Sequence, residues 1–124
     1  MFDHIGLRVT DLEVSCRFYA ALLAPLGFVP GPRGEEYAGF GPPDAPAFWL
    51  HGAAPGAVPG GGWGAHVALR APDRDAVARF HAAGLAAGGR DNGAPGVRAD
   101  YASDYYAAFV IDPDGNNIEA VRMG

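Results

Sequence analysis

The sequence contains an internal repeat whose two copies lie 62 positions apart. Residues 3–28 align with residues 65–90 without a gap. The copies share a histidine, a Leu-Arg pair, an aspartate and an Arg-Phe pair in the same order. The recurring residues are His4, Leu7, Arg8, Asp11, Arg17, Phe18, Ala20, Ala21, Leu23, Ala24 and Gly27, which return as His66, Leu69, Arg70, Asp73, Arg79, Phe80, Ala82, Ala83, Leu85, Ala86 and Gly89. Such a repeat indicates two copies of one supersecondary unit, neither of which buries its apolar face alone.

Each copy is predicted to begin with a strand and continue into a helix. Apolar residues alternate with other residues directly after each histidine, which is the pattern of a half-buried strand. Helical spacing follows, beginning in the first copy at Thr10, where Glu13 completes a capping box, and ending near Gly27. In the second copy the helix is predicted to begin at Asp73 and to end at Gly88-Gly89.

Short strands separated by turns are predicted to complete each copy. The turn over 112–116, Asp-Pro-Asp-Gly-Asn, predicts an antiparallel hairpin around it. The pattern predicts an α+β fold of two βαβββ modules, residues 1–51 and 63–124, joined by a Gly, Ala and Pro-rich linker over 52–62. The strands predicted after the helices cover residues 36–40, 47–51, 97–101, 105–111 and 117–122.

Composition limits the classes of partner. At 124 residues the chain has the size of one domain. A net charge of −5 with scattered basic residues argues against nucleic acid as a partner, and no apolar run is long enough to span a membrane. No export signal is recognisable, so we expect a cytoplasmic protein. The lone Cys16 falls in a helical pattern and is interpreted as a packing residue.

Two histidines and one glutamate form a candidate metal site. His4 and His66 occupy equivalent positions of the repeat, and Glu119 lies on the opposite face of its predicted strand from Ile118 and Ala120. A buried carboxylate needs a partner, and two histidines with one carboxylate hold a divalent metal such as Zn, Ni, Mn, Fe or Co. The alternative is that the histidines are hydrogen-bonded core residues and that the glutamate pairs with Arg8, Arg70 or Arg122.

The motifs that carry these residues resemble, over nearly the whole chain, the vicinal oxygen chelate superfamily of glyoxalases, bleomycin-resistance proteins and extradiol dioxygenases. They are Asp3-His4-Ile5-Gly6-Leu7-Arg8-Val9, Phe18-Tyr19, Leu26-Gly27-Phe28, Ala65-His66-Val67-Ala68-Leu69 and Asp112-Pro113-Asp114-Gly115-Asn116-Asn117-Ile118-Glu119. The resemblance implies that the modules curve into a cleft of mixed sheet. It also implies that His4, His66 and Glu119 are the metal ligands.

The chain departs from the glyoxalase I pattern at the fourth ligand position. The last strand of the first module reads Ala-Phe-Trp-Leu-His over 47–51 and offers no carboxylate, so Trp49 stands where the family's glutamate is expected and His51 is a possible substitute ligand or base. Tyr105 and Tyr106 precede a strand that is predicted to line the cleft. One of them is expected to donate a hydrogen bond to a substrate oxygen, while the other packs away from it.

The resemblance implies chemistry in which a metal chelates two neighbouring oxygens of a small substrate and stabilises developing negative charge. The leading hypothesis is a metal-dependent lyase or isomerase of glyoxalase type, with Tyr105, Tyr106 or His51 as the proton-transfer or orienting group. The alternatives are a non-catalytic antibiotic-binding protein of the bleomycin-resistance kind and a dioxygenase-like enzyme. Relatives of this size commonly form homodimers, so the site is expected either within one chain or across a dimer.

Overall fold

The computed structural model describes residues 1–52 and 64–124 and confirms the two βαβββ modules. The linker predicted over 52–62 lies outside the described residues, except for Gly52, which ends a strand. The first module contains β1 (Ile5–Val9), α1 (Leu12–Leu23), a short 3-10 helix η1 (Ala24–Leu26), β2 (Val29–Arg33), β3 (Tyr37–Gly41) and β4 (Phe48–Gly52). The second contains β5 (His66–Arg70), α2 (Arg74–Ala86), β6 (Arg90–Val97), β7 (Tyr106–Ile111) and β8 (Asn117–Arg122).

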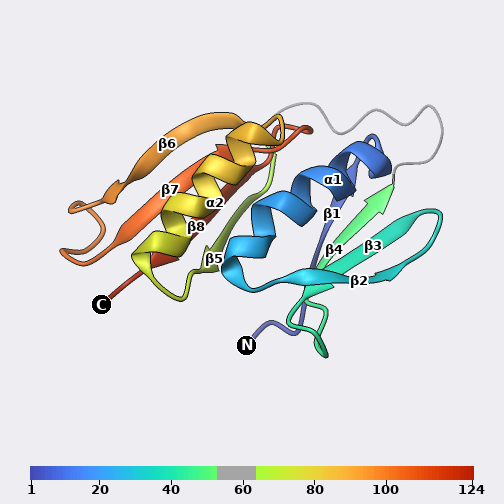
Figure 1. The fold of residues 1–124 in the computed structure, drawn as a ribbon, viewed down its shortest axis with the longest axis horizontal. Coiled ribbons are helices and arrows are strands. Elements are labelled where there is room, and N and C mark those ends of the chain that lie inside the picture. Colours follow the sequence, from blue (N-terminus) through green and yellow to red (C-terminus); the bar gives the residue numbers. More distant parts are fainter. Residues whose placement is uncertain (53–63) are drawn as a thin grey trace.

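The two modules have the same sheet topology, as the sequence repeat requires. The strand order is β1-β4-β3-β2 in one sheet and β5-β8-β7-β6 in the other. In each module the first strand pairs in parallel with the last strand, and the remaining neighbours are antiparallel. The strands that carry the repeated histidine motif, β1 and β5, therefore each lie at the edge of a sheet (Figure 1).

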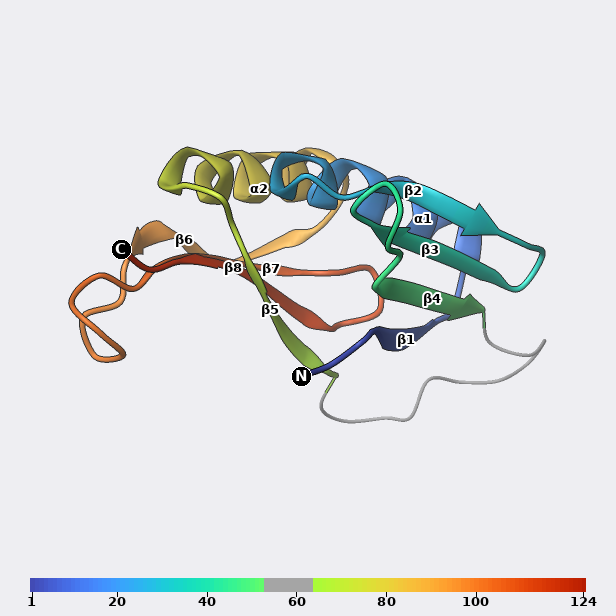
Figure 2. The ribbon, with the colours of Figure 1, turned by 90° about the horizontal axis from the view of Figure 1, so that it is seen from below.

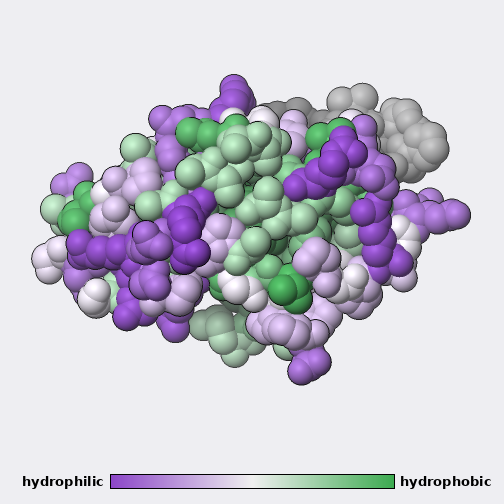
Figure 3. All heavy atoms as spheres, viewed as in Figure 1, coloured by the Kyte–Doolittle hydropathy of each residue, from purple (hydrophilic) through white to green (hydrophobic). Residues whose placement is uncertain are grey.

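Both helices cover the same side of the molecule, and the sheets lie beneath them (Figures 1 and 2). The core fills the space between helices and sheets, and its largest buried side chains are Tyr19, Phe18, Phe48, Phe80, Leu22, Leu23 and Leu50. On the helix side, hydrophobic residues gather toward the centre, and hydrophilic residues lie mostly toward the margin (Figure 3). The opposite face of each sheet carries no helix in the described structure (Figure 2).

Two strands, β2 and β6, form largely in segments for which the sequence predicted no strand. The Gly and Pro-rich segments that became β2 and β6 are edge strands, and an edge strand needs ladder hydrogen bonds on one side only, so it tolerates proline. The predicted strand over 97–101 was wrong, because β6 ends at Val97 and residues 98–105 form a turn. That turn is closed by the amide of Arg98, which donates to the carbonyl of Tyr105 at 2.7 Å.

The helix caps follow the predicted positions in one module and shift by one residue in the other. Asp73 caps α2, with its carboxylate accepting from the amide of Ala76 at 2.7 Å, as predicted. The capping box at Thr10 was wrong, since Asp11 is the N-cap of α1. Thr10 is instead engaged by Asp114, whose carboxylate accepts from the Thr10 amide at 3.0 Å and from its hydroxyl.

The predicted turn over 112–116 forms and ties the two modules together. Asp112, which is buried, accepts from the amides of Asp114 and Asn116 and from the hydroxyl of Tyr19 on α1. Burial, together with the neighbouring Asp112 carboxylate, raises the pKa of Tyr19 above its ordinary range. This hydrogen-bonded turn therefore fixes α1 of the first module against the β7–β8 hairpin of the second.

No helix in the described parts of the chain combines the length and the apolar character needed to cross a membrane. Cys16 is buried in the core, as predicted, and burial raises the pKa of its thiol.

Candidate functional site

The open face of the second module brings together side chains from β5, β7 and β8. Ile118 and Ala120 point into the core beneath the helices, so Glu119 between them points to the open face. Parallel pairing sets Ala68 beside Glu119, and antiparallel pairing sets Phe109 on its other side. The face therefore carries Glu119 between the strand of His66 and the strand of Phe109.

Glu119 is a buried carboxylate that contacts two side chains, His66 and Tyr105. Its side chain is 2% exposed, and its Oε1 lies 2.9 Å from His66 Nε2. The hydroxyl of Tyr105 donates to its other oxygen, Oε2, at 2.5 Å. Within the described residues no arginine pairs with Glu119, and the chain contains no lysine. The predicted alternative pairing with Arg8, Arg70 or Arg122 is therefore absent from this part of the structure.

The hydroxyl of Tyr105 donates a hydrogen bond to Glu119. Burial of its hydroxyl, followed by the hydrogen bond to Glu119 and the charge of that carboxylate, raises the pKa of Tyr105 to about 12. The phenol is therefore protonated at neutral pH, which suits an orienting role rather than that of a general base.

Tyr106 points the other way, as the alternation of a strand requires. Its ring packs against the core on the helix side, and the guanidinium of Arg74 lies 4.8 Å from the ring centroid. Of the two candidate tyrosines, Tyr105 is the one that reaches the open face and contacts Glu119, while Tyr106 packs away from it, as expected for one of the pair.

His4 is not part of the His66–Glu119 cluster. It directly precedes β1, its side chain is 58% exposed, and its Nδ1 lies 2.6 Å from the carboxylate of its neighbour Asp3. His4 and His66 do line one groove of about 600 Å³ between the first strands of the two modules. Even so, no three metal-ligating side chains come close enough together among residues 1–52 and 64–124 to hold an ion.

The open face of the first module carries the residues around the fourth ligand position. Trp49 lies over Gly39, where an added Cβ would come within 2.8 Å of the indole ring. The exposed His51 lies in the same way over Gly6, at 3.2 Å from the position of a Cβ. Trp49 and His51 thus share a face, as predicted, but neither contacts Glu119 of the second module in the structure.

The chemistry of the donor set fits a divalent cation at Glu119 and His66. A carboxylate this deeply buried is expensive to leave without a cation or strong donors, and the imidazole beside it is 55% exposed and open to solvent. Together the two side chains offer the nitrogen and oxygen ligands that Zn, Ni, Mn, Fe and Co accept. They are two of the three side chains that the sequence predicted as metal ligands.

Sequence reasoning missed the residues that border this cluster. A pocket of about 480 Å³ on the same face joins His66 to Arg98 and Asn92, with Phe109 and Asn117 between them. The sequence predicted a strand at Arg98 and no strand at Asn92. It did not predict on which face of the sheet either side chain lies. The sequence signal for this arrangement is the pair of glycines at 93 and 96, because strand positions without side chains let a long side chain lie flat along β6.

The repeated modules, their common sheet order and the His66–Glu119 pair define a class of two-module α+β proteins with polar side chains on the open sheet faces. The model of the glyoxalase/bleomycin resistance protein/dioxygenase superfamily matches residues 1–120, and the chain belongs to that superfamily.

Solved structures agree with this assignment. A glyoxalase/bleomycin resistance protein from Albidiferax ferrireducens is 36% identical, with a TM-score of 0.85 over 98% of each chain. A family enzyme from Burkholderia phytofirmans is 16% identical, with a TM-score of 0.74 over 98% of each chain, and likewise has the fold. A glyoxalase-related enzyme from Fulvimarina pelagi is 24% identical, with a TM-score of 0.68 over 94% of this chain and 84% of its own. Comparison with curated proteins found no match.

Proposed function

We propose that this protein is a metal-dependent lyase or isomerase of glyoxalase type that acts on a small substrate with two neighbouring oxygens. The observation that carries the proposal is the buried Glu119 carboxylate, 2.9 Å from His66 Nε2 and without an arginine partner among the described residues. His66 and Glu119 would hold the metal, which when bound supplies Lewis-acid polarisation of the substrate oxygens.

The chain's own residues set the environment of that chemistry. Tyr105 positions Glu119 through its hydroxyl, and because its pKa is raised it retains its proton at neutral pH. Phe109 lies with its ring centroid 6.2 Å from that of His66 and provides an apolar floor that limits water beside the site. His51, exposed on the other module, is the proposed proton-transfer group.

The third ligand is proposed to come from a second copy of the chain. Within one chain His4 lies apart from the His66–Glu119 cluster, yet it lies on the equivalent strand of the repeat. Both β1 and β5 present an edge without a neighbouring strand among the described strands, and an exposed edge is a surface available for pairing. A homodimer that sets the first module of one chain against the second module of the other would supply His4 to each site.

The proposal is tested by metal content and thermal stability of the protein before and after chelation. We expect about one equivalent of metal per chain, and stabilisation on readdition that rises with metal concentration, reaching about 2.7 kcal/mol at a hundredfold excess over Kd. Glu119→Gln should abolish both effects. His81→Gln is the matched control, because His81 pairs with Asp91 away from the site.

A second candidate function, sequestration of a small molecule without catalysis, is favoured by one observation. Among the described residues, no third His, Cys, Asp or Glu side chain lies close enough to His66 and Glu119 to form a three-residue metal site. The expected result for this binding role is a protein that holds no metal after mild purification and whose thermal stability changes with neither chelator nor added metal. That result would contradict the proposed enzyme.

A further inference from the structure

Arg98 lies on the open face of the second module, beside the His66–Glu119 pair. Its Nη1 donates to the carbonyl of Gly96 at 2.8 Å and its Nη2 to the carbonyl of Ala94 at 2.7 Å. Its guanidinium carbon lies 5.4 Å from the centroid of the Phe109 ring. Three contacts thus hold the guanidinium in one place, in contrast to the free rotation of an ordinary surface arginine.

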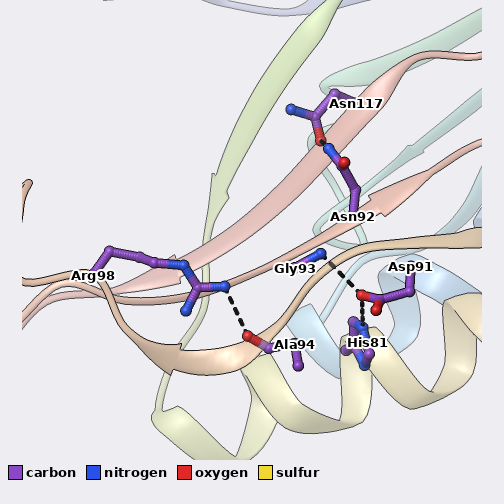
Figure 4. A network of polar contacts seen from close by, with 7 residues as sticks. All are labelled: His81, Asp91, Asn92, Gly93, Ala94, Arg98 and Asn117. Carbon is purple, nitrogen blue, oxygen red and sulfur yellow. Dashed lines mark hydrogen bonds and ion pairs between the residues drawn. The ribbon is translucent and has the colours of Figure 1, made fainter.

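Two glycines of β6 lie beneath the Arg98 side chain. An added Cβ at Gly93 would come within 3.0 Å of Nη2 and within 2.8 Å of the Phe109 ring, and a Cβ at Gly96 would lie 3.3 Å from Nη1. The absence of side chains at Gly93 and Gly96 leaves the space in which the arginine lies flat across β6. Figure 4 shows it stretched along the strand, with its contact to Ala94.

The charge of Arg98 has no carboxylate partner in the structure. No ion pair of Arg98 occurs among the described residues, and the segment 53–63 contains no acidic side chain. The nearby Asp91 is turned to the helix side, where His81 Nε2 and the Gly93 amide each lie 2.9 Å from its Oδ1 (Figure 4). The two carbonyls engage two of the five N–H donors of the guanidinium, so donors remain for a ligand.

The pocket that joins Arg98 to His66 contains amides and no carboxylate. Asn92 donates to Asn117 at 3.1 Å along its wall (Figure 4), and Phe109 forms its floor between the imidazole and the guanidinium. A ligand in this pocket would have one end at the proposed metal ligand His66, an apolar middle over the ring and its other end at a fixed cation.

From this arrangement we propose that Arg98 is a specificity residue that binds the terminal oxyanion of a substrate whose neighbouring oxygens lie at His66 and Glu119. The substrate class is a short-chain compound with a chelating head and a distal carboxylate, phosphate or phosphonate. A planar guanidinium recognises each of these groups through paired N–H donors. The inference rests on the proposed function for the position of the head group, and on Arg98 alone for the anion.

The test compares ligands that differ only at the distal end. Binding of 2-oxopentanoate, 2-oxoglutarate and 2-oxo-4-phosphonobutanoate is measured by calorimetry on the metal-stripped and the metal-loaded protein. We expect the two distal anions to bind about tenfold more tightly than 2-oxopentanoate, since a hydrogen bond to a charged group contributes about one decade in Kd. The ratio between carboxylate and phosphonate identifies the preferred oxyanion.

Variants separate the contribution of Arg98 from that of overall charge. Arg98→Gln should remove the preference for a distal anion, and Arg98→Lys should retain part of it. Arg90→Gln removes the same charge from an exposed position at the start of β6, the strand that Arg98 follows, and should leave the preference intact. Melting temperatures of all variants verify that they fold.

The outcomes are distinguishable from failure of the proposed function. If added metal changes no affinity, the metal site is contradicted, while the comparison of wild type with Arg98→Gln still measures the anion site. If the wild type does not prefer a distal anion in either metal state, or if Arg98→Gln keeps that preference, the role of Arg98 is overturned.

Discussion

At the scale of the residue, the account depends on how Glu119 is held. The carboxylate is buried and receives a hydrogen bond from Tyr105, so the phenol and the carboxylate behave as one unit. Alternation along a strand is enough to predict from sequence that Glu119 faces away from the core. That Tyr105 rather than Tyr106 reaches it depends on where β7 begins, which the sequence predicts only to within a residue or two.

The raised pKa of Tyr105 leads to a pH prediction. Its ordinary pKa is about 10, and burial with the contact to Glu119 raises it to about 12 in the folded protein. The folded state therefore favours the protonated phenol, and this stabilisation is complete below about pH 10 and lost as pH rises through about 12. Phenolate absorbance of the chelator-treated protein should contain a step near pH 12 that Tyr105→Phe removes. If Tyr105→Phe instead removes absorbance at the ordinary value of about 10, the contact is contradicted.

At the scale of the element, the helices and central strands were predictable and two edge strands were not. The segments that form α1, α2, β4 and β8 have clear apolar periodicity, which reports burial. The segments of β2 and β6 have none, because strands at the sheet edge with exposed residues are selected by pairing rather than by burial. Arg98 directly follows β6, so the same lack of apolar periodicity left its place on the open face unpredicted.

The contact between α2 and its surroundings gives a prediction at this scale. Gly84 lies in α2, and an added Cβ would come within 2.8 Å of Leu22 on α1 and within 3.0 Å of Val110 on β7, both fully buried. Alanine gains about 1 kcal/mol of helix propensity over glycine, but overpacking a filled core costs about 1–3 kcal/mol. We expect Gly84→Ala to lower the free energy of unfolding, measured by urea denaturation. An increase would show that the helices have room to move apart.

At the scale of the whole molecule, the repeat predicted the architecture better than it predicted the site. Equivalent positions of two modules give equivalent places on two sheets, and His4 and His66 do occupy such places. Whether two sheets of one chain face each other depends on how α1 packs beside α2, which no residue pattern encodes. The chain pairs His66 with Glu119 and leaves His4 on the other module, so a complete three-ligand site is proposed only for a dimer.

A shared site predicts complementation between damaged chains. His4→Ala and His66→Ala proteins should each bind metal weakly, but a refolded equimolar mixture should contain heterodimers in which one of the two sites is intact. Random pairing should restore about a quarter of the wild-type metal content, measured after gel filtration. A site built within one chain predicts no restoration, which would contradict the dimer proposal while leaving His66 and Glu119 as ligands.

The most direct measurement is a crystal structure of the metal-loaded protein with anomalous diffraction collected at the absorption edge of the added metal. We predict an anomalous peak bonded to His66 Nε2 and to the Glu119 carboxylate, with the imidazole of His4 from a second chain completing the set. A crystal that takes up metal elsewhere, or that keeps the 2.9 Å contact between His66 and Glu119 with no peak beside it, would contradict the central claim.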